Sequence, residues 1–202
     1  SKIVNTPALH ARWLATLSYL ELCGAQKIAH YLPQKVEDSE LLQHAAEEFR
    51  HAYFFNRQIS KIFPSTHKEK STELLCGRVG RRYLSLLDLS IARYIRQHAK
   101  KRDIRRDCYL LTSYIIEIRA QKLYTVYESV LRKCASPISL RGILKEEIAH
   151  LHLMKKQVSK DPFLEQATQK LISAEEKLFD RMLQELSDQV TSFDASHLSQ
   201  SA

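Results

Sequence analysis

The stretch LLQHAAEEFRHAYFFNRQI, residues 41–59, decides the fold because its apolar positions recur at helical spacing. Steps of four and three give an apolar seam that holds one acid; its members are Leu41, Ala45, Glu48, Ala52, Phe55 and Ile59. His51 follows Glu48 by three residues, about 60° round the same helix, so an oxygen and a nitrogen point toward one spot. A buried carboxylate is costly unless it is protonated, paired or bound to a metal. The stretch therefore predicts a compensated acid on the buried side of a helix.

The same construction recurs in ILKEEIAHLHLM, residues 143–154. There, Glu147 and His150 repeat the spacing of acid and imidazole on an apolar stripe. A helical pattern with one acid on its apolar face precedes each motif, and those acids are Glu21 and Glu117. The two acids of each pair are 27 and 30 residues apart, which suits an antiparallel helical hairpin with both acids at mid-depth. The chain is therefore predicted to contain two copies of one hairpin.

Composition favours an all-α fold, because 4 Gly and 5 Pro in 202 residues are few for the turns that connect the strands of a sheet. We expect one domain over residues 1–187 and a disordered tail over residues 188–202, which are rich in Ser, Gln and Asp. The four cysteines show no CxxC or other metal spacing, as is typical of reduced packing residues. No apolar run reaches the roughly 20 residues that span a bilayer, and no signal peptide opens the chain, so we expect a cytoplasmic protein.

Start and stop signals place the helices. Pro7, Pro137 and Pro162 suit first turns, whereas Pro33 and Pro64 suit the positions just after a helix. The predicted helices cover about residues 7–32, 39–62, a crossover within 72–100, 103–133, 137–158 and 162–187.

Four helices that each carry a buried acid, two of them with a histidine three residues on, resemble the ferritin-like di-iron carboxylate superfamily over about residues 8–157. The resemblance implies a ferritin-like four-helix bundle, with a long helical crossover between two hairpins and an extra C-terminal helix. The metal ligands that it implies are Glu21, Glu48, His51, Glu117, Glu147 and His150, with Glu48 and Glu147 bridging. It also implies two iron ions, or manganese or a mixed Mn/Fe pair, whose charge four carboxylates neutralise.

Several alternatives stay open at this level. Glu47 and Glu146 stand next to the implied ligands and also reach the histidines, and Glu128 returns to nearly the same face as the acid of its helix. The acids can also lie at the helix surface, paired with Arg50 or Arg119.

Two further residues, His44 and Tyr124, are candidate catalytic groups, and Tyr127 lies on the same helical face as Tyr124. His44 faces the same side as the motif histidine seven residues on, as a partner of the metal ligands or as a solvent-facing residue near the helix end. Tyr124 and Tyr127 are placed to donate hydrogen bonds or to be oxidised near the metals, or simply to pack.

The chain has a net charge of +8, and ten basic residues fall within residues 78–106. They predict a positive face near the crossover, which is either solvated or an RNA contact.

The resemblance implies a di-iron, or iron/manganese, oxidase or oxygenase. Such an enzyme activates dioxygen or peroxide, takes electrons from an external donor, and oxidises a small or nucleoside-containing substrate. The chain lacks the CxxC pairs of rubrerythrins and is far shorter than ribonucleotide reductase small subunits, while its basic charge disfavours iron storage. Glu117-Ile-Arg119-Ala120 and the interval to Glu147 look similar to tRNA hydroxylases of a prenylated adenosine, which is one alternative. A non-enzymatic helical adaptor with a basic face is another, and a homodimer is one candidate assembly.

Overall fold

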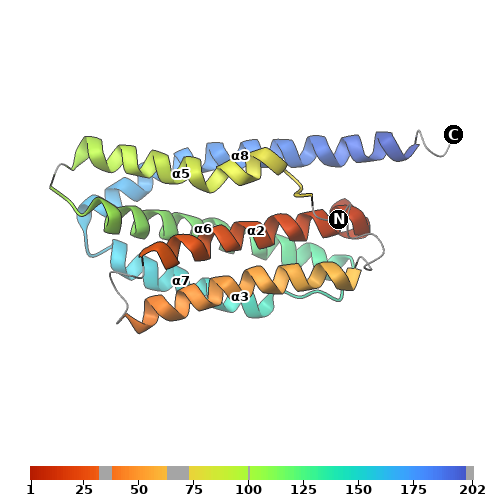
Figure 1. Ribbon diagram of the computed structural model, residues 1–202, viewed down its shortest axis with the longest axis horizontal. Coiled ribbons are helices and arrows are strands. Elements are labelled where there is room, and N and C mark those ends of the chain that lie inside the picture. The colour runs from red at the N-terminus through yellow and green to blue at the C-terminus, as the bar shows by residue number, and fades with distance from the viewer. Residues whose placement is uncertain (32–37, 63–72, 100, 199–202) are drawn as a thin grey trace.

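The computed structural model describes residues 1–31, 38–62, 73–99 and 101–198 (Figure 1). Every regular element within these ranges is a helix, which confirms the expected all-α fold. The elements are α1 (Lys2–Asn5), α2 (Pro7–Tyr31), α3 (Ser39–Ile62), α5 (Gly77–His98), α6 (Ile104–Lys133), α7 (Arg141–Val158) and α8 (Pro162–Leu198).

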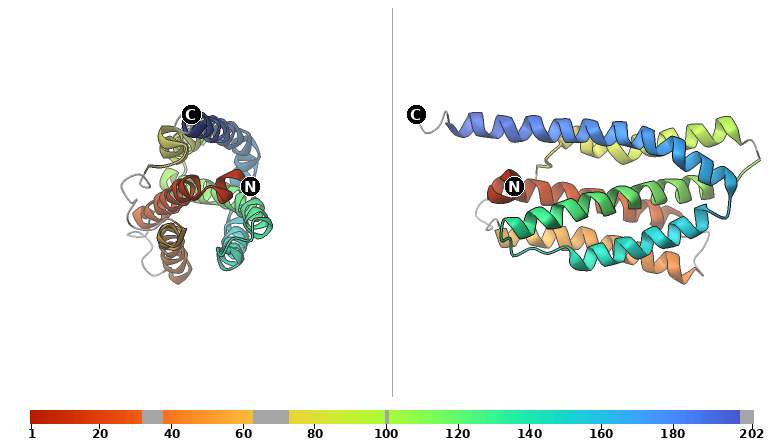
Figure 2. Two further views of the ribbon diagram at one scale, coloured as in Figure 1. Left: turned by 90° about the vertical axis from the view of Figure 1, so that its right-hand side faces the viewer. Right: turned by 180° about the vertical axis from the view of Figure 1, so that it is seen from behind.

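The long helices lie in three layers of two (Figure 1, Figure 2). One outer layer holds α5 and α8, the middle layer holds α2 and α6, and the other outer layer holds α3 and α7. The hairpin α2–α3 therefore packs beside the hairpin α6–α7, and α5 connects the two along the chain. Because α2 and α6 are covered on both sides, acids that they carry toward α3 and α7 are shielded from solvent.

Capping side chains explain where the helices begin. The carboxylate of Asp38 accepts a backbone hydrogen bond of 3.0 Å at the start of α3, and Asp103 caps α6 in the same way. Pro7 occupies the first position of α2, as predicted. The predicted stops at Pro33 and Pro64 lie outside the described residues.

The start of α7 differs from the prediction, because the helix begins at Arg141 and not at Pro137. Ala135 has a φ of 50°, and the backbone N–H of Ser136 donates back to the last turn of α6 at 2.9 Å. The carboxylate of Glu128 then accepts the backbone N–H of Leu140 at 2.7 Å. This segment is therefore held in a turn until α7 starts.

The predicted disorder of residues 188–202 is wrong as far as residue 198, because α8 continues to that position. Residues 199–202 lie outside the described ranges. Val190 and Phe193 pack against the apolar core, and the side chain of Gln189 accepts a backbone N–H at the start of α5 at 3.1 Å. Two apolar residues at helical spacing outweigh the polar composition of this segment.

The core consists of two apolar clusters with a polar centre between them. Along α2, Leu17 belongs to the first cluster, Ile28 to the second, and Glu21 lies between them. An acid also lies between members of the two clusters along α3, α6 and α7. The fold thus holds its buried acids at one level, with apolar packing on both sides.

Among the described residues, no helix combines the length and apolar character needed to cross a bilayer. All four cysteines, which lie within the described ranges, carry free thiols.

Candidate metal centre

Four buried glutamates meet between the two apolar clusters, one from each helix of the two hairpins. They are Glu21 on α2, Glu48 on α3, Glu117 on α6 and Glu147 on α7. Each is at most 7% exposed, so water does not compensate their charge. We call them the inner glutamates.

One half of the centre adds His51 to three inner glutamates. The candidate ligand atoms of Glu21, Glu48, His51 and Glu147 all lie within 4.8 Å of one another. The Nδ1 atom of the histidine is 3.0 Å from Glu147 Oε1 and 3.7 Å from Glu21 Oε2. Two atoms bonded to one ion at about 2.1 Å are at most about 4.2 Å apart, so small shifts suffice for this group to hold an ion.

The other half of the centre contains His150 and also His44. The candidate ligand atoms of His44, Glu48, Glu117 and His150 form a second group within 4.8 Å. His150 Nδ1 lies 3.3 Å from Glu48 Oε1, and His44 Nε2 lies 3.0 Å from Glu117 Oε1. Glu48 belongs to both groups, which places its carboxylate between two ion positions.

Unsatisfied polar atoms test whether these residues fit a metal. Within the described residues, seven buried side-chain nitrogen or oxygen atoms lack a hydrogen-bond partner. Six of them lie in the centre: Nδ1 of His44, His51 and His150, Oε1 of Glu48 and Glu147, and Oε2 of Glu117. Each such atom costs about 1–3 kcal/mol if it stays unpaired. Lone pairs on carboxylate oxygens and imidazole nitrogens are the donors that iron and manganese accept, so the residues fit the ions.

Two outer acids hold the motif histidines, each from the opposite hairpin. His51 Nε2 donates to Glu146 Oε2 at 2.7 Å, and His150 Nε2 donates to Glu47 Oε2 at 2.6 Å. A neutral imidazole that donates from Nε2 directs its Nδ1 lone pair into the centre. The structure thus distinguishes the two glutamates of each adjacent pair. Glu48 and Glu147 point into the centre, whereas the outer acids orient the motif histidines.

The electrostatics of the centre follow from burial and from crowded carboxylates. Burial, with Glu48 and Glu147 nearby, raises the pKa of Glu21 and Glu117 well above the usual value. Burial opposes the charge of Glu48 too, but the nearby rings of His150 and His44, whose nitrogens lie 3.3 Å and 3.5 Å from Glu48 Oε1, hold its pKa below the usual range. Although burial disfavours its charge, His51 has a pKa raised to about 11 by Glu147 and Glu21. The raised pKa values therefore favour protonated side chains in the metal-free centre.

The pKa of His150 is also raised, because hydrogen bonds to Glu48 and Glu47 outweigh the opposing effect of burial. The pKa of Glu47 and of Glu146 is lowered; burial opposes this shift, but hydrogen bonds to side chains that include the histidines outweigh it. The outer acids thus stay ionised, as partners of a histidine should.

An internal repeat relates the two halves. Positions of α6 correspond to positions of α2 that are 96 residues earlier, and positions of α7 to those of α3 that are 99 earlier. All six implied ligands and both outer acids obey these offsets. His44 does not, because its counterpart is Ile143.

The structure brings both candidate catalytic residues to the centre. The hydroxyl of Tyr124 donates to the carboxylate of Glu21, so it holds an implied ligand. His44 is 2% exposed, so the solvent-facing alternative is wrong. Its spacing of four residues before Glu48 was the sequence signal that it belongs to the ligand group itself.

The other side chains that the sequence left as alternatives form different pairs in the structure. Glu128 accepts the backbone N–H of Leu140, so it caps the start of α7 and is not a member of either group. Arg119 pairs with Glu175 at 2.7 Å, and Arg50 pairs with the outer acid Glu146 at 2.8 Å. Surface pairing therefore does not account for the inner glutamates.

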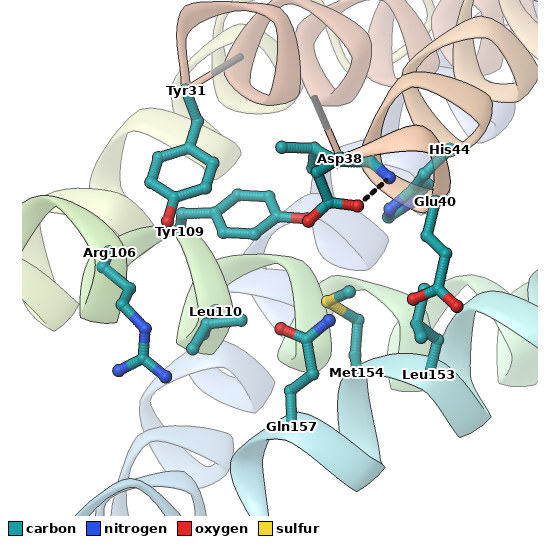
Figure 3. A pocket seen from close by; sticks show the side chains of 11 residues that line it. Tyr31, Asp38, Glu40, His44, Arg106, Tyr109, Leu110, Leu153, Met154 and Gln157 are labelled. Carbon is teal, nitrogen blue, oxygen red and sulfur yellow. Dashed lines mark hydrogen bonds between the residues drawn. The ribbon is translucent and has the colours of Figure 1, made fainter. Parts of the chain in front are cut away.

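Two cavities reach the centre. A small one of about 50 Å³ is lined by all four inner glutamates and by apolar side chains such as Leu20, Ile116 and Leu123. A larger one of about 160 Å³ has His44 in its wall and is lined by side chains from the ends of four helices (Figure 3). The centre is thus buried but has space on two sides.

No family model matches the chain, and neither a curated protein nor a solved structure shows significant similarity to it. The arrangement of the side chains therefore carries the functional argument.

Proposed function

We propose that the protein is a di-iron carboxylate oxidoreductase of the ferritin-like superfamily, an oxidase or oxygenase that uses dioxygen or peroxide. The observation that carries the proposal is that buried carboxylates and imidazoles form two groups, in each of which the candidate ligand atoms lie within 4.8 Å of one another. Six buried nitrogen or oxygen atoms of these residues also lack a hydrogen-bond partner. Mixed carboxylate and imidazole donors suit iron, and manganese or a mixed pair satisfies the same ligands. Glu21, His51 and Glu147 would hold one ion, and His44, Glu117 and His150 the other. Glu48 belongs to both groups.

A pair of redox-active ions supplies the electrons that activate dioxygen. The residues of this chain orient the ligands and exclude water. The outer acids Glu47 and Glu146 fix the ring orientation of the histidines, and Tyr124 fixes the carboxylate of Glu21. The cavity of about 50 Å³ beside the inner glutamates has room for a molecule the size of dioxygen or water.

Metal analysis tests the proposal. Protein purified without chelator should contain about two iron or manganese ions per chain by mass spectrometry, and the reduced form should consume dioxygen. Glu147→Ala and His51→Ala should each lose most of the metal, because each removes a ligand atom and leaves buried partners. The matched control is His152→Ala, since this histidine is exposed on the same helix and should leave the metal content unchanged.

A metal-free protein would contradict the proposal. If the wild-type chain contains no metal, and Glu48→Ala leaves thermal stability unchanged or higher, the acid has no bound ion to hold. The chain would then be a helical adaptor that uses its basic residues to bind a partner.

A tRNA hydroxylase is the second candidate, favoured by the position of the basic stretch. Arg106 lines the larger cavity, so the start of α6 lies beside a route to the centre. Part of the stretch is engaged within the protein, since Arg102 and Arg106 contact Asp107, and Arg105 donates to the carbonyl of His30. Salt-sensitive retention on a tRNA column would support this candidate, and retention that does not change with salt would contradict it.

A further inference from the structure

The cavity of about 160 Å³ lies where α2 and α7 end and α3 and α6 begin. Figure 3 shows side chains from all four helices around it, including Tyr31 from α2, His44 from α3, Tyr109 from α6 and Met154 from α7. The Nε2 atom of His44 is 3.0 Å from Glu117 Oε1, so the inner wall of the cavity touches the second candidate ion position.

The internal repeat places an equivalent set of residues at the opposite end of the centre, and this set is bulkier or more apolar. The pairs are Tyr109 and Trp13, Met154 and Phe55, Leu153 and Phe54, and His44 and Ile143. At the opposite end, Trp13, Phe55 and Ile143 belong to one apolar cluster, and each is at most 6% exposed. Phe55 and Ile143 thus fill the space beside the centre at this end, which we call the filled end. Trp13 there lines an apolar groove of about 470 Å³ that contains neither an inner glutamate nor a motif histidine, whereas the cavity at the other end has His44 in its wall.

The filled end also holds a buried hydrogen bond. His10 and Tyr127 share a bond of 2.6 Å there. Their counterparts at the open end are Arg106 and Tyr31, and the arginine side chain is 44% exposed. Tyr31 instead stacks on Tyr109, with ring centroids 4.3 Å apart and planes inclined by 9°. The two ends of the repeat therefore differ, and the end at His44 holds a cavity beside the candidate metal centre with Tyr31 and Tyr109 in its wall.

We propose that this cavity binds an uncharged single-ring aromatic molecule with hydroxyl or amino substituents and holds it beside His44, as the organic substrate of the proposed oxidoreductase. This step rests on the proposed function. An engineered cavity of about 150 Å³ holds benzene, so about 160 Å³ has room for one ring. The stacked tyrosines and the Met154 sulfur offer the contacts that aromatic rings prefer.

The rim of the cavity selects the substituents. Asp38 and Glu40 line it, and carboxylates accept hydrogen bonds from hydroxyl and amino groups but repel an anion. Arg106 does not offset them fully, because its guanidinium lies 3.3 Å from Asp107 Oδ1. Gln157 supplies an amide that both donates and accepts. A neutral ring with donor groups therefore fits this rim better than a carboxylate or a phosphate.

Fluorine NMR titration with para-fluorophenol tests the proposal on the full chain, as purified and after metal removal. The probe should bind both forms with a Kd on the order of 1 mM, and a fluorinated naphthol should bind at least about tenfold more weakly because two rings exceed the space. Loading with paramagnetic Mn²⁺ should accelerate relaxation of the bound probe. Leu153→Phe, which copies the filled end, should weaken binding at least about tenfold.

A second variant and a matched control complete the experiment. Gln157→Trp blocks the same cavity from a half-buried position, so it tests the site even if the first variant is unstable. Leu183→Phe makes the same exchange in a separate apolar groove of about 470 Å³ and should bind like wild type. Binding that survives both cavity variants, is lost in Leu183→Phe, or is equal for the naphthol overturns the proposal.

Metal content of the same samples separates this proposal from the function on which it rests. If the purified chain contains no metal but binds the probe, and Leu153→Phe blocks that binding, the cavity assignment is supported and the oxidoreductase is refuted. If the chain contains the expected amount of metal but does not bind the probe, the oxidoreductase is supported and the cavity assignment is refuted.

Discussion

Loading the centre with metal should release protons, and the number released follows from four groups. Glu21, Glu117, His51 and His150 all have a pKa raised above the ordinary value in the metal-free protein. A raised pKa favours the protonated form of each group, and any proton that the group holds must leave before it offers a lone pair to an ion. Two divalent ions bring four positive charges, and four departing protons remove the same charge. The exchange keeps the buried charge constant, which is why we expect it to be close to complete.

The expected magnitude is about four protons per two ions near pH 7.5. For His51, deprotonation from a pKa of about 11 costs about 5 kcal/mol at that pH, which lowers the apparent metal affinity. Because metal binding releases protons, the apparent metal affinity falls as pH falls and protons compete better for the same groups. The apparent affinity should fall by about 100-fold per ion for each pH unit while all four groups exchange.

A titration with Mn²⁺ in weak buffer, with a pH indicator or a pH-stat, measures the protons directly. Calorimetry in two buffers of different ionisation enthalpy gives the same number independently. The control is His152→Gln, because this exposed residue is two positions from His150 and should leave the release unchanged. Release of less than about one proton per two ions would refute the reasoning, since the ions would then bind groups that are already deprotonated.

Three further changes have definite outcomes. Glu47→Ala or Glu146→Ala should weaken Mn²⁺ binding about 10–100-fold by equilibrium dialysis, because each releases a ligand histidine, while the Gln variants should lose less. Burial lowers the pKa of His10 to about 4, so the free energy of unfolding should fall by about 3 kcal/mol as pH drops from about 6.5 to about 4. Urea unfolding of His10→Gln, which keeps a hydrogen-bonding group but does not titrate, should lack that component, and an unchanged pH profile would contradict the assignment. Arg119→Met should destabilise the fold by about 3–5 kcal/mol in urea unfolding, because it leaves the buried carboxylate of Glu175 with the Tyr83 hydroxyl but without its cationic partner; a loss under about 1 kcal/mol would contradict the pairing.

The sequence predicted the helices and the level of the acids well, because both depend on local rules. Apolar residues at spacings of three and four determine which face of a helix is buried, and a lone acid such as Glu48 or Glu117 on that face is visible without coordinates. Capping residues such as Asp38 and Asp103 have the same local character. The two errors at helix ends arose where distant contacts decide the outcome, as for Glu128 at the start of α7.

Other features of the site depend on how the two hairpins dock, which no local pattern contains. Glu47 and Glu48 are adjacent in the chain, but only the position of α7 determines that the first bonds to His150 and the second faces the centre. His44 had an ambiguous pattern for the same reason, because burial near the start of α3 depends on α6 and α7. The cavity depends on the volumes of side chains from four helices, so spacing alone gives no sign of it.

The crossed hydrogen bonds make the two hairpins depend on each other for the same chemistry. Glu146 holds His51, and Glu47 holds His150, so each motif histidine is oriented by the hairpin that does not carry it. Each half of the centre also contains an inner glutamate from the opposite hairpin, since Glu147 lies with His51 and Glu48 with His150. A single hairpin therefore supplies neither a complete ligand group nor a correctly oriented imidazole. The repeated hairpin gives two similar half-sites in the proposed centre, but His44 belongs to only one of them, so the two candidate ion positions are chemically different.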